Sequence, residues 1–296
     1  MSSSSPVVVV TGANGLVGAA VCRALAERSA QVRAVVRRPG TAPVLAGVVE
    51  HVGDAADVLA GADALVTTVH PMGSAREVQH EVGVEGTARL ARAARDAGVA
   101  RLVHVSTAGV LDRAPGLGDL AEDAALLPPG SGDYPDTKNA ADAALAEVEG
   151  LTTVLVRPPA IAGAGATSVW NTLRPRAFRE GDRSVNPAKS WAWVHVDDLA
   201  ALLADVAVGA VATSDDPEQG PVAGGTTPVH VAGEPATWGD YLSAVGEALG
   251  IEPDWTDEPV WTGQLVTARA RRWGWSPQVG LPQALAELRA GLAGEG

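Results

Sequence analysis

Residues 7–18 read VVVVTGANGLVG, and this stretch sets the expectation for the whole chain. Four consecutive valines are typical of a strand buried on both faces of a parallel sheet. The strand runs into a turn with glycines at positions 12, 15 and 18, after which a helical pattern begins. Backbone N–H groups at the start of such a helix attract phosphate, and glycines allow its close approach. The stretch therefore predicts dinucleotide binding, with a tight turn that holds no ligand as the alternative.

The composition argues against a membrane or nucleic-acid role. Hydrophobic residues make up 46% of the 296 residues, but no apolar run reaches the roughly 18 residues of a membrane span. The net charge of -13 is opposite to the basic surface that nucleic acid requires. The single cysteine, Cys22, excludes an internal disulfide. Because the serine tract at 1–6 does not resemble a signal peptide, we expect a cytoplasmic protein.

Strand and helix patterns alternate along the first half of the chain. Strand patterns lie at 7–11, 32–37, 48–52, 64–69, 102–106 and 152–157, and helical patterns at 16–28, 75–97 and 136–148. The alternation predicts an α/β Rossmann fold, a doubly wound parallel sheet that binds ligands beyond the carboxyl ends of its strands. After Pro158 the pattern loosens, leaving a strand at 229–232 and helices at 238–249 and 281–292.

The aromatic residues indicate a second, smaller lobe. Every Trp, Tyr and Phe lies at position 134 or later. We expect residues 1–170 plus 191–206 to form the dinucleotide-binding domain, and residues 171–190 plus 207–296 to form a C-terminal substrate-binding lobe. Most of the eight tryptophans are expected to pack in cores, although aromatic side chains also line pockets for apolar or aromatic ligands.

Two arginines follow the second strand and indicate which dinucleotide binds. Arg37 and Arg38 stand where an acidic residue would bind the ribose 2′-hydroxyl of NAD. An arginine there accommodates the 2′-phosphate of NADP, since a guanidinium suits bidentate phosphate recognition. The pair favours NADP(H) over NAD(H), with two solvated surface arginines as the alternative.

A tyrosine and a lysine predict the chemistry. Tyr134 and Lys138 are four residues apart and share one face of the helix after the fifth strand. A free tyrosine has a pKa near 10, and a neighbouring ammonium favours the phenolate, which would suit proton transfer at neutral pH. Ser106 and Thr107 end the fifth strand, where a hydroxyl can orient a substrate oxygen or simply cap the turn.

With these motifs in order, residues 6–200 resemble the extended short-chain dehydrogenases/reductases, the NAD-dependent epimerase/dehydratase group. The matching segments are TGANGLVG at 11–18, GD at 53–54, VSTAGV at 105–110, ED at 122–123, Tyr134 with Lys138, RPPA at 157–160 and WVHVDD at 193–198. Within this group, the chain resembles the reductase branch, which includes the dihydroflavonol reductases, mainly because of Arg37 after the second strand.

The resemblance implies site residues. It gives Thr107, Tyr134 and Lys138 catalytic roles. It implies cofactor contacts from Gly12, Asn14, Gly15, Leu16, Val17, Gly18, Arg37, Arg38, Asp54, Val69, Tyr134, Lys138, Pro158 and Ala160. It is compatible with a homodimer through helices 75–97 and 136–148. No metal is expected, because the histidines at 51, 80, 104 and 230 lack metal-ligand spacing.

The chain departs from the family pattern at two positions. Gly83 replaces the usual asparagine and offers no side chain to organise the helix or a proton-relay water. His70 stands where the family usually has a small residue. This histidine either approaches the cofactor ribose or the substrate, or caps a loop.

These observations favour an NADP(H)-dependent oxidoreductase. It would transfer a hydride between nicotinamide and a carbonyl or secondary alcohol of a small organic substrate, with Tyr134 as acid and base. An NAD-dependent nucleotide-sugar epimerase or dehydratase is one alternative, disfavoured by Arg37 and by a second lobe without a basic cluster. A non-catalytic NADP(H)-sensing protein is the other, disfavoured by the Tyr134 and Lys138 pair.

Overall fold

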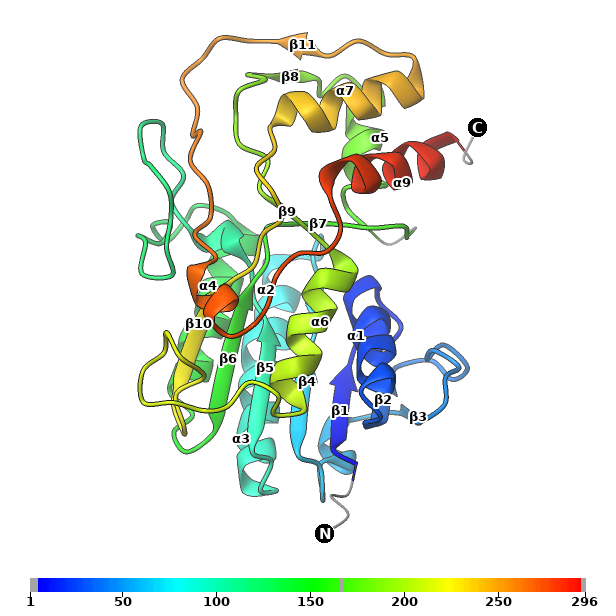
Figure 1. Cartoon of the computed structure of the whole chain (residues 1–296). Coiled ribbons are helices and arrows are strands. Elements are labelled where there is room, and N and C mark those ends of the chain that lie inside the picture. Colours follow the sequence, from blue (N-terminus) through cyan, green and yellow to red (C-terminus); the bar gives the residue numbers. More distant parts are fainter. Residues whose placement is uncertain (1–4, 166–167, 294–296) are drawn as a thin grey trace.

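A parallel sheet forms the centre of the computed structural model, which describes residues 5–165 and 168–293 (Figure 1). Its seven strands lie in the order β10-β6-β5-β4-β1-β2-β3. They are β1 (Val7–Thr11), β2 (Gln31–Val36), β3 (Val48–Val52), β4 (Ala64–Thr67), β5 (Arg101–Val105), β6 (Thr152–Arg157) and β10 (Thr226–His230). The strand order reverses between β1 and β4, which is the switch point of a doubly wound sheet. The predicted Rossmann fold is confirmed.

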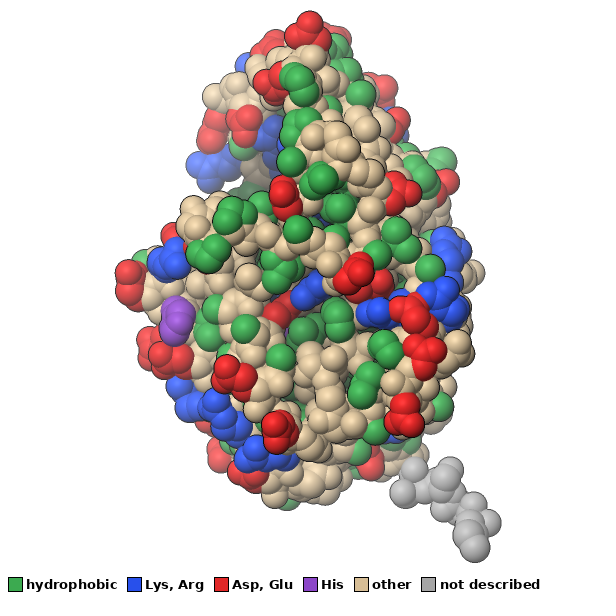
Figure 2. All heavy atoms as spheres, turned by 90° about the vertical axis from the view of Figure 1, so that its left-hand side faces the viewer, with side chains coloured by type: hydrophobic (Ala, Val, Ile, Leu, Met, Phe, Trp, Pro, Cys, Tyr) green, Lys and Arg blue, Asp and Glu red, His purple; other side chains and the backbone are tan. Residues whose placement is uncertain are grey.

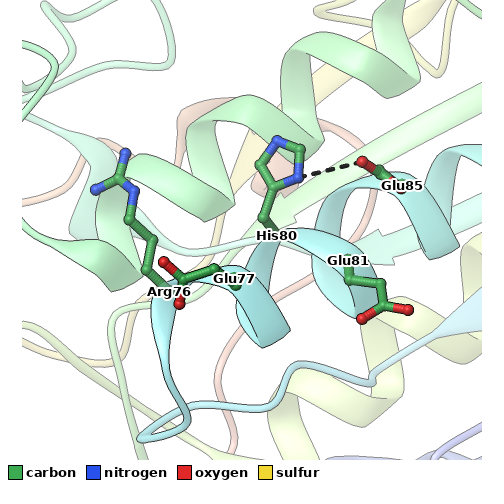
Figure 3. A pocket seen from close by; sticks show the side chains of 5 residues that line it. All are labelled: Arg76, Glu77, His80, Glu81 and Glu85. Carbon is green, nitrogen blue, oxygen red and sulfur yellow. Dashed lines mark ion pairs between the residues drawn. The ribbon is translucent and has the colours of Figure 1, made fainter.

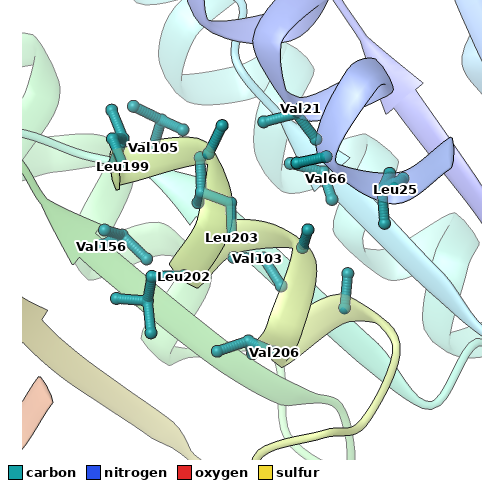
Figure 4. Packing of buried hydrophobic residues seen from close by; sticks show 14 of the residues in the cluster. Val21, Leu25, Val66, Val103, Val105, Val156, Leu199, Leu202, Leu203 and Val206 are labelled. Carbon is teal, nitrogen blue, oxygen red and sulfur yellow. The ribbon is translucent and has the colours of Figure 1, made fainter. Parts of the chain in front are cut away.

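Helices cover both faces of this sheet, and the alternation of side chains along β1 explains why. Val8 and Val10 pack against α1 (Leu16–Glu27) and α6 (Val196–Ala207). Val9 points to the other face, toward α3 (Thr87–Asp96) and α4 (Asp133–Ala146). Figure 4 shows the first of these cores, in which leucines of α6 lie over valines of β5 and β6. A strand buried on both faces therefore reads as an unbroken apolar run.

The helical segment predicted over 75–97 is irregular. It begins as α2 (Arg76–Gln79), widens into a π-helical segment over His80–Gly86, and continues as α3. It ends as expected at Gly98, whose φ of 78° is left-handed. Short π-helical segments inside α-helices are frequent at functional sites. This one contains Gly83, the first of the two departures from the family pattern.

A smaller group of elements lies beyond the carboxyl ends of the sheet (Figure 1). It comprises α5 (Leu173–Arg179), β8 (Ser184–Val185), α7 (Trp238–Leu249), β11 (Asp254–Trp255) and α9 (Leu281–Ala293). Its core contains Trp191, Trp193 and Tyr241, whose rings stack on one another, and α9 packs against α7. Aromatic side chains thus fill the irregular space between short elements.

The predicted division into two lobes stays a prediction, but the chain returns to the sheet more often than expected. β7 (Ala160–Ala162) pairs with β9 (Trp193–His195), and α6 then packs on the sheet. The strand predicted at 229–232 becomes β10, an edge strand of the main sheet, where Pro228 is tolerated. α8 (Ala268–Arg272) packs against β10. Both elements lie within 207–296, the range assigned to the substrate lobe.

The described residues contain no helix that is long and apolar enough to cross a bilayer. Cys22 is buried in α1, as its helical position suggested. The first four residues of the serine tract lie outside the described part of the chain.

Candidate functional site

A cavity of about 1170 Å³ extends along the carboxyl edge of the sheet. Its lining includes the predicted site residues Gly12, Asn14, Gly15, Leu16, Val17, Gly18, Arg37, Asp54, Val69, Thr107, Tyr134, Lys138, Pro158 and Ala160. Arg38 is the one predicted residue that does not line it. Residues that are distant in the sequence therefore meet at one site, although their roles there stay predictions.

The glycine turn brings two stretches of backbone into close contact. Gly12 has a φ of 66°, a conformation that favours glycine. A Cβ atom on Gly18 would lie only 2.1 Å from the carbonyl oxygen of Gly12. α1 begins after Gly15 with no side-chain cap and no acidic residue in its first turn. The N–H groups and the positive end of the helix dipole thus face the cavity without a competing anion.

The loop after β2, which carries Arg37 and Arg38, is held by a carboxylate on β3. Glu50 accepts hydrogen bonds from the N–H groups of Ala42, Gly40 and Thr41 at 2.9, 2.8 and 3.0 Å. These bonds lower the pKa of Glu50 below its usual value. Arg37 therefore stands at the cavity wall on an ordered loop, in a position to meet a phosphate.

Tyr134 and Lys138 lie one turn apart at the start of α4, and both line the cavity. Lys138 Nζ donates a hydrogen bond to the carbonyl oxygen of Val105 at 2.8 Å. Burial lowers the pKa of Lys138 to about 8, although Asp142 acts in the opposite direction. Burial raises the pKa of Tyr134, against the effect of its hydrogen bond to Thr107. The charge of Asp142 also raises the pKa of Tyr134. A lowering by Lys138 together with a bound cationic nicotinamide stays a prediction.

The two hydroxyls at the end of β5 have different partners. Ser106 Oγ donates a hydrogen bond to Asp142 Oδ2 at 2.8 Å, and the same oxygen pairs with Arg157 at 3.3 Å. The Ser106 hydroxyl is thereby occupied by the buried ion pair of Asp142 and Arg157. Thr107 Oγ1 accepts the N–H of Gly109 at 3.0 Å and is hydrogen-bonded to Tyr134, so that this hydroxyl lies beside the tyrosine in the cavity wall. Thr107 is the better placed of the two for substrate.

The two departures from the family pattern lie against each other. A Cβ atom on Gly83 would lie 3.1 Å from Cδ2 of His70. The His70 ring packs edge-on against Tyr134, with 5.1 Å between the ring centroids. Burial, and next the charge of Lys138, lower the pKa of His70 to about 4, so the imidazole is neutral at pH 7. The missing side chain at position 83 makes room for an imidazole beside the tyrosine.

This contact predicts that Gly83→Ala has different effects on the free energy of unfolding in the presence and in the absence of the His70 ring. In the native background, the Cβ of Gly83→Ala must displace the His70 ring, which offsets the gain of about 1 kcal/mol from replacing a helical glycine. In His70→Ala the space is free, and the same substitution should raise the free energy of unfolding. Urea unfolding of the four proteins measures the coupling, for which we expect about 1 kcal/mol or more. Additive effects would show that the two residues do not share this space.

Several apolar side chains that line the cavity are exposed. They are Val69, Met72, Val78 and Val82, between 39% and 49% exposed. Of the eight tryptophans, all within described residues, Trp170 alone lines the cavity, while Trp273 and Trp275 pack in the sheet core. The tryptophans therefore act mostly in packing, as expected. Arg113 and His70 also line the cavity, and no sequence motif pointed to Arg113.

A second, shallow pocket lies on the surface of α2 and the π-helical segment (Figure 3). Arg76 pairs there with Asp133 and Asp136, and His80 Nδ1 lies 3.5 Å from Glu85. Ion pairs at this exposure contribute little to stability or recognition. On the face shown in Figure 2, basic side chains likewise lie among acidic ones.

Comparison with protein families matches residues 12–208 to a family described as NAD(P)H-binding. The chain is 35% identical over 188 residues to a "4-hydroxy-2-methyl-3-oxo-4-farnesyl-3,4-dihydroquinoline-1-oxide ketoreductase" from Stigmatella aurantiaca, covering 57% of this chain and 56% of that protein. It is 32% identical over 219 residues to a "2-alkyl-3-oxoalkanoate reductase" from Stenotrophomonas maltophilia, covering 69% and 66%. The matches span less than two thirds of the length of either relative.

Solved structures share the fold over nearly the whole chain. The Bordetella bronchiseptica enzyme WbmH in complex with NAD+ matches with a TM-score of 0.78 and 20% identity, covering 99% of this chain and 100% of that one. MoeE5 in complex with UDP-glucose and NAD matches with a TM-score of 0.73 and 22% identity, covering 97% and 99%. At these identities the likeness shows the Rossmann architecture.

Proposed function

This chain belongs to the NAD(P)H-binding, short-chain dehydrogenase/reductase-like family of oxidoreductases, and on that premise we propose that it is an NADP(H)-dependent carbonyl reductase. The observation that carries the proposal is the single cavity that joins the glycine turn, Arg37, Thr107, Tyr134 and Lys138. A cytoplasmic location and a homodimer, through the helical segment at 75–97 and α4, belong to the same proposal.

The residues present fit a bound dinucleotide. The uncapped start of α1 suits a pyrophosphate, and the close approach of Gly18 to Gly12 leaves no room for a side chain in the turn. Arg37 would hold the 2′-phosphate, Asp54 would contact the adenine end, and Lys138 would hold the nicotinamide ribose. When bound, NADP(H) supplies or accepts the hydride at its nicotinamide ring.

Tyr134 and Thr107 carry the protein's part of the chemistry. In the reductive direction the carbonyl carbon gains the hydride and the carbonyl oxygen gains the proton of the Tyr134 hydroxyl. The raised pKa of Tyr134 keeps that proton in place at neutral pH, as an acid requires. Thr107, which is hydrogen-bonded to Tyr134, would turn its hydroxyl proton to the same substrate oxygen and orient it. The phenolate that remains regains its proton from solvent.

The substrate that we propose is an organic carbonyl compound with a sizeable apolar body. The exposed apolar side chains of the cavity wall would cover such a body, because their burial removes apolar surface from water. The two relatives carry the names of a ketoreductase of a farnesylated ring and of an alkyl oxoacid reductase, both acting on carbonyl groups. A nucleotide-sugar substrate would need a basic cluster for its diphosphate. Of the described Lys and Arg residues that line the cavity, Arg37 and Lys138 are assigned to the cofactor, and Arg113 alone is left. This weighs against the epimerase alternative.

Parallel titrations with NADPH and NADH test the cofactor assignment. We expect tighter binding of NADPH, because a hydrogen bond to a charged group contributes about 1.5–3 kcal/mol. Arg37→Ala should then weaken NADPH binding by about 10–100-fold and leave NADH binding unchanged. Tryptophan fluorescence gives both dissociation constants, and Arg92→Ala, on the exposed face of α3, is the matched control. A wild-type preference for NADH would overturn the role of Arg37.

A further inference from the structure

Arg113 is a cation in the cavity wall that the proposed mechanism does not use. Its Nη2 group donates a hydrogen bond to the carbonyl oxygen of Ala108 at 2.9 Å, and its guanidinium lies 5.3 Å from the ring centroid of Trp261. Its Nε is buried without a hydrogen-bond partner. Burial lowers the pKa of Arg113, and no acidic group among the described residues opposes this effect.

Two neighbouring arginines differ from Arg113 in having a carboxylate partner. Arg157, Arg269 and Arg113 all act on the buried ring of His230 and, after burial itself, help to lower its pKa to about 3. Arg157 pairs with Asp142 at 3.3 Å, and Arg269 pairs with Glu218 at 2.5 Å. His230 is neutral and cannot serve as a counter-ion. Arg113 alone of the three has no carboxylate within the described part of the chain.

We propose that Arg113 binds a carboxylate of the substrate, an inference that rests on the proposed reductase function. A charge held away from water is costly unless it is paired, and Arg113 lines the cavity. The stack on Trp261 and the bond to Ala108 fix the plane of the guanidinium. A fixed plane favours the two-pronged hydrogen bonding that a carboxylate accepts. The substrate class is therefore an oxo acid, or the matching hydroxy acid.

The position of Arg113 also limits the distance between the two functional groups of that substrate. Ala108, which accepts its hydrogen bond, directly follows Thr107. Gly109 directly follows Ala108, and a Cβ atom on Gly109 would be 3.9 Å from Cε1 of Tyr134. This proximity favours a substrate whose acid and reacting carbon are a few bonds apart, as in a 3-oxo acid. The apolar wall is left for the alkyl tail. A single guanidinium suits one carboxylate better than a diphosphate.

A matched pair of substrates tests this assignment. 3-Hydroxydecanoate and its methyl ester differ in charge, and we expect the intact enzyme to oxidise both with NADP+. The wild type should prefer the acid through a lower KM. Arg113→Met should lower kcat/KM for the acid by about 10–100-fold and leave the ester unchanged, because only the acid loses a charged hydrogen bond. Arg113→Lys should restore part of the preference for the acid. Arg92→Met should leave kcat/KM unchanged for both substrates.

The outcomes separate this inference from the function on which it rests. Equal turnover of acid and ester by the wild type, or an equal loss of both in Arg113→Met, would overturn the carboxylate site while leaving the reductase intact. No turnover of either compound would count against the reductase proposal. In that case the melting temperature of the NADPH complex still tests Arg113. 3-Hydroxydecanoate should raise it in the wild type and not in Arg113→Met, and an equal rise in both would refute the carboxylate site.

Discussion

Tyr134→Phe should lower kcat for carbonyl reduction by about 100- to 10,000-fold, the usual contribution of a positioned general acid. The substitution removes one oxygen and keeps the ring that packs against His70, so the cavity should retain its shape. Without the hydroxyl the developing alkoxide has no proton donor, while Thr107 still orients the oxygen. Steady-state kinetics measure kcat, and a fluorescence titration should give an NADPH dissociation constant within about threefold of the wild type.

The chain supplies a matched control for this change. Tyr241 is its second tyrosine, and its hydroxyl donates a hydrogen bond to the carbonyl oxygen of Trp170 at 2.6 Å. Tyr241→Phe should act on stability, at about 1 kcal/mol for one hydrogen bond, with little effect on kcat. If Tyr134→Phe kept the wild-type kcat, Tyr134 could not be the proton donor, whatever the fate of the cofactor site.

Gly18→Ala should weaken NADPH binding by about 100-fold or more, because hydrogen bonds to the charged pyrophosphate, each contributing about 1.5–3 kcal/mol, would be lost. The new Cβ would lie 2.1 Å from the carbonyl oxygen of Gly12, whereas real contacts stay above 3.0 Å. The glycine turn must therefore move away from α1, together with the N–H groups that would face the pyrophosphate. We also expect a loss of about 1–3 kcal/mol in the free energy of unfolding from the overpacking.

A glycine in another helix gives the opposite result. Gly291 lies in α9, is exposed, and has no atom within 4 Å of the position that a Cβ would take. Gly291→Ala should raise stability by about 0.5–1 kcal/mol, since alanine restricts the unfolded chain more than glycine does. Thermal unfolding with and without NADPH compares the two variants. A Gly18→Ala protein with the full wild-type NADPH-induced shift would disprove the role of this turn.

The sequence predicted best those elements whose signals are local. The bounds of β1, β3, β6 and α7 agree with the predicted ranges. The buried strands read as continuous apolar runs between polar or glycine breaks. α7 carries its own signals, because Thr237 and Asp240 form a capping box and Gly250 ends the helix with a φ of 67°. Such elements need no information from distant parts of the chain.

The features that the sequence did not predict depend on long-range packing. Gly83 and His70 were recognised separately as departures, but only the fold shows that the space left by one holds the other. Arg113 lies in a loop without a motif, and its lack of a carboxylate is a property of its surroundings. The raised pKa of Tyr134 likewise follows from burial and then from the charge of Asp142. Neither the surroundings of Arg113 nor the pKa of Tyr134 can be derived from the spacing of residues along the sequence.

The smaller group of elements has a core assembled from distant stretches, with Phe178 from α5, Tyr241 from α7 and Leu288 from α9. During synthesis, β1 to β6 leave the ribosome first, and domains generally fold from the N-terminus as they emerge. The dinucleotide half can therefore close while the substrate half still lacks α9, which packs on α7. In that interval the aromatic rings around Tyr241 stay uncovered. The nascent chain should then bind a chaperone through this region, and cofactor would stabilise the half that is already folded.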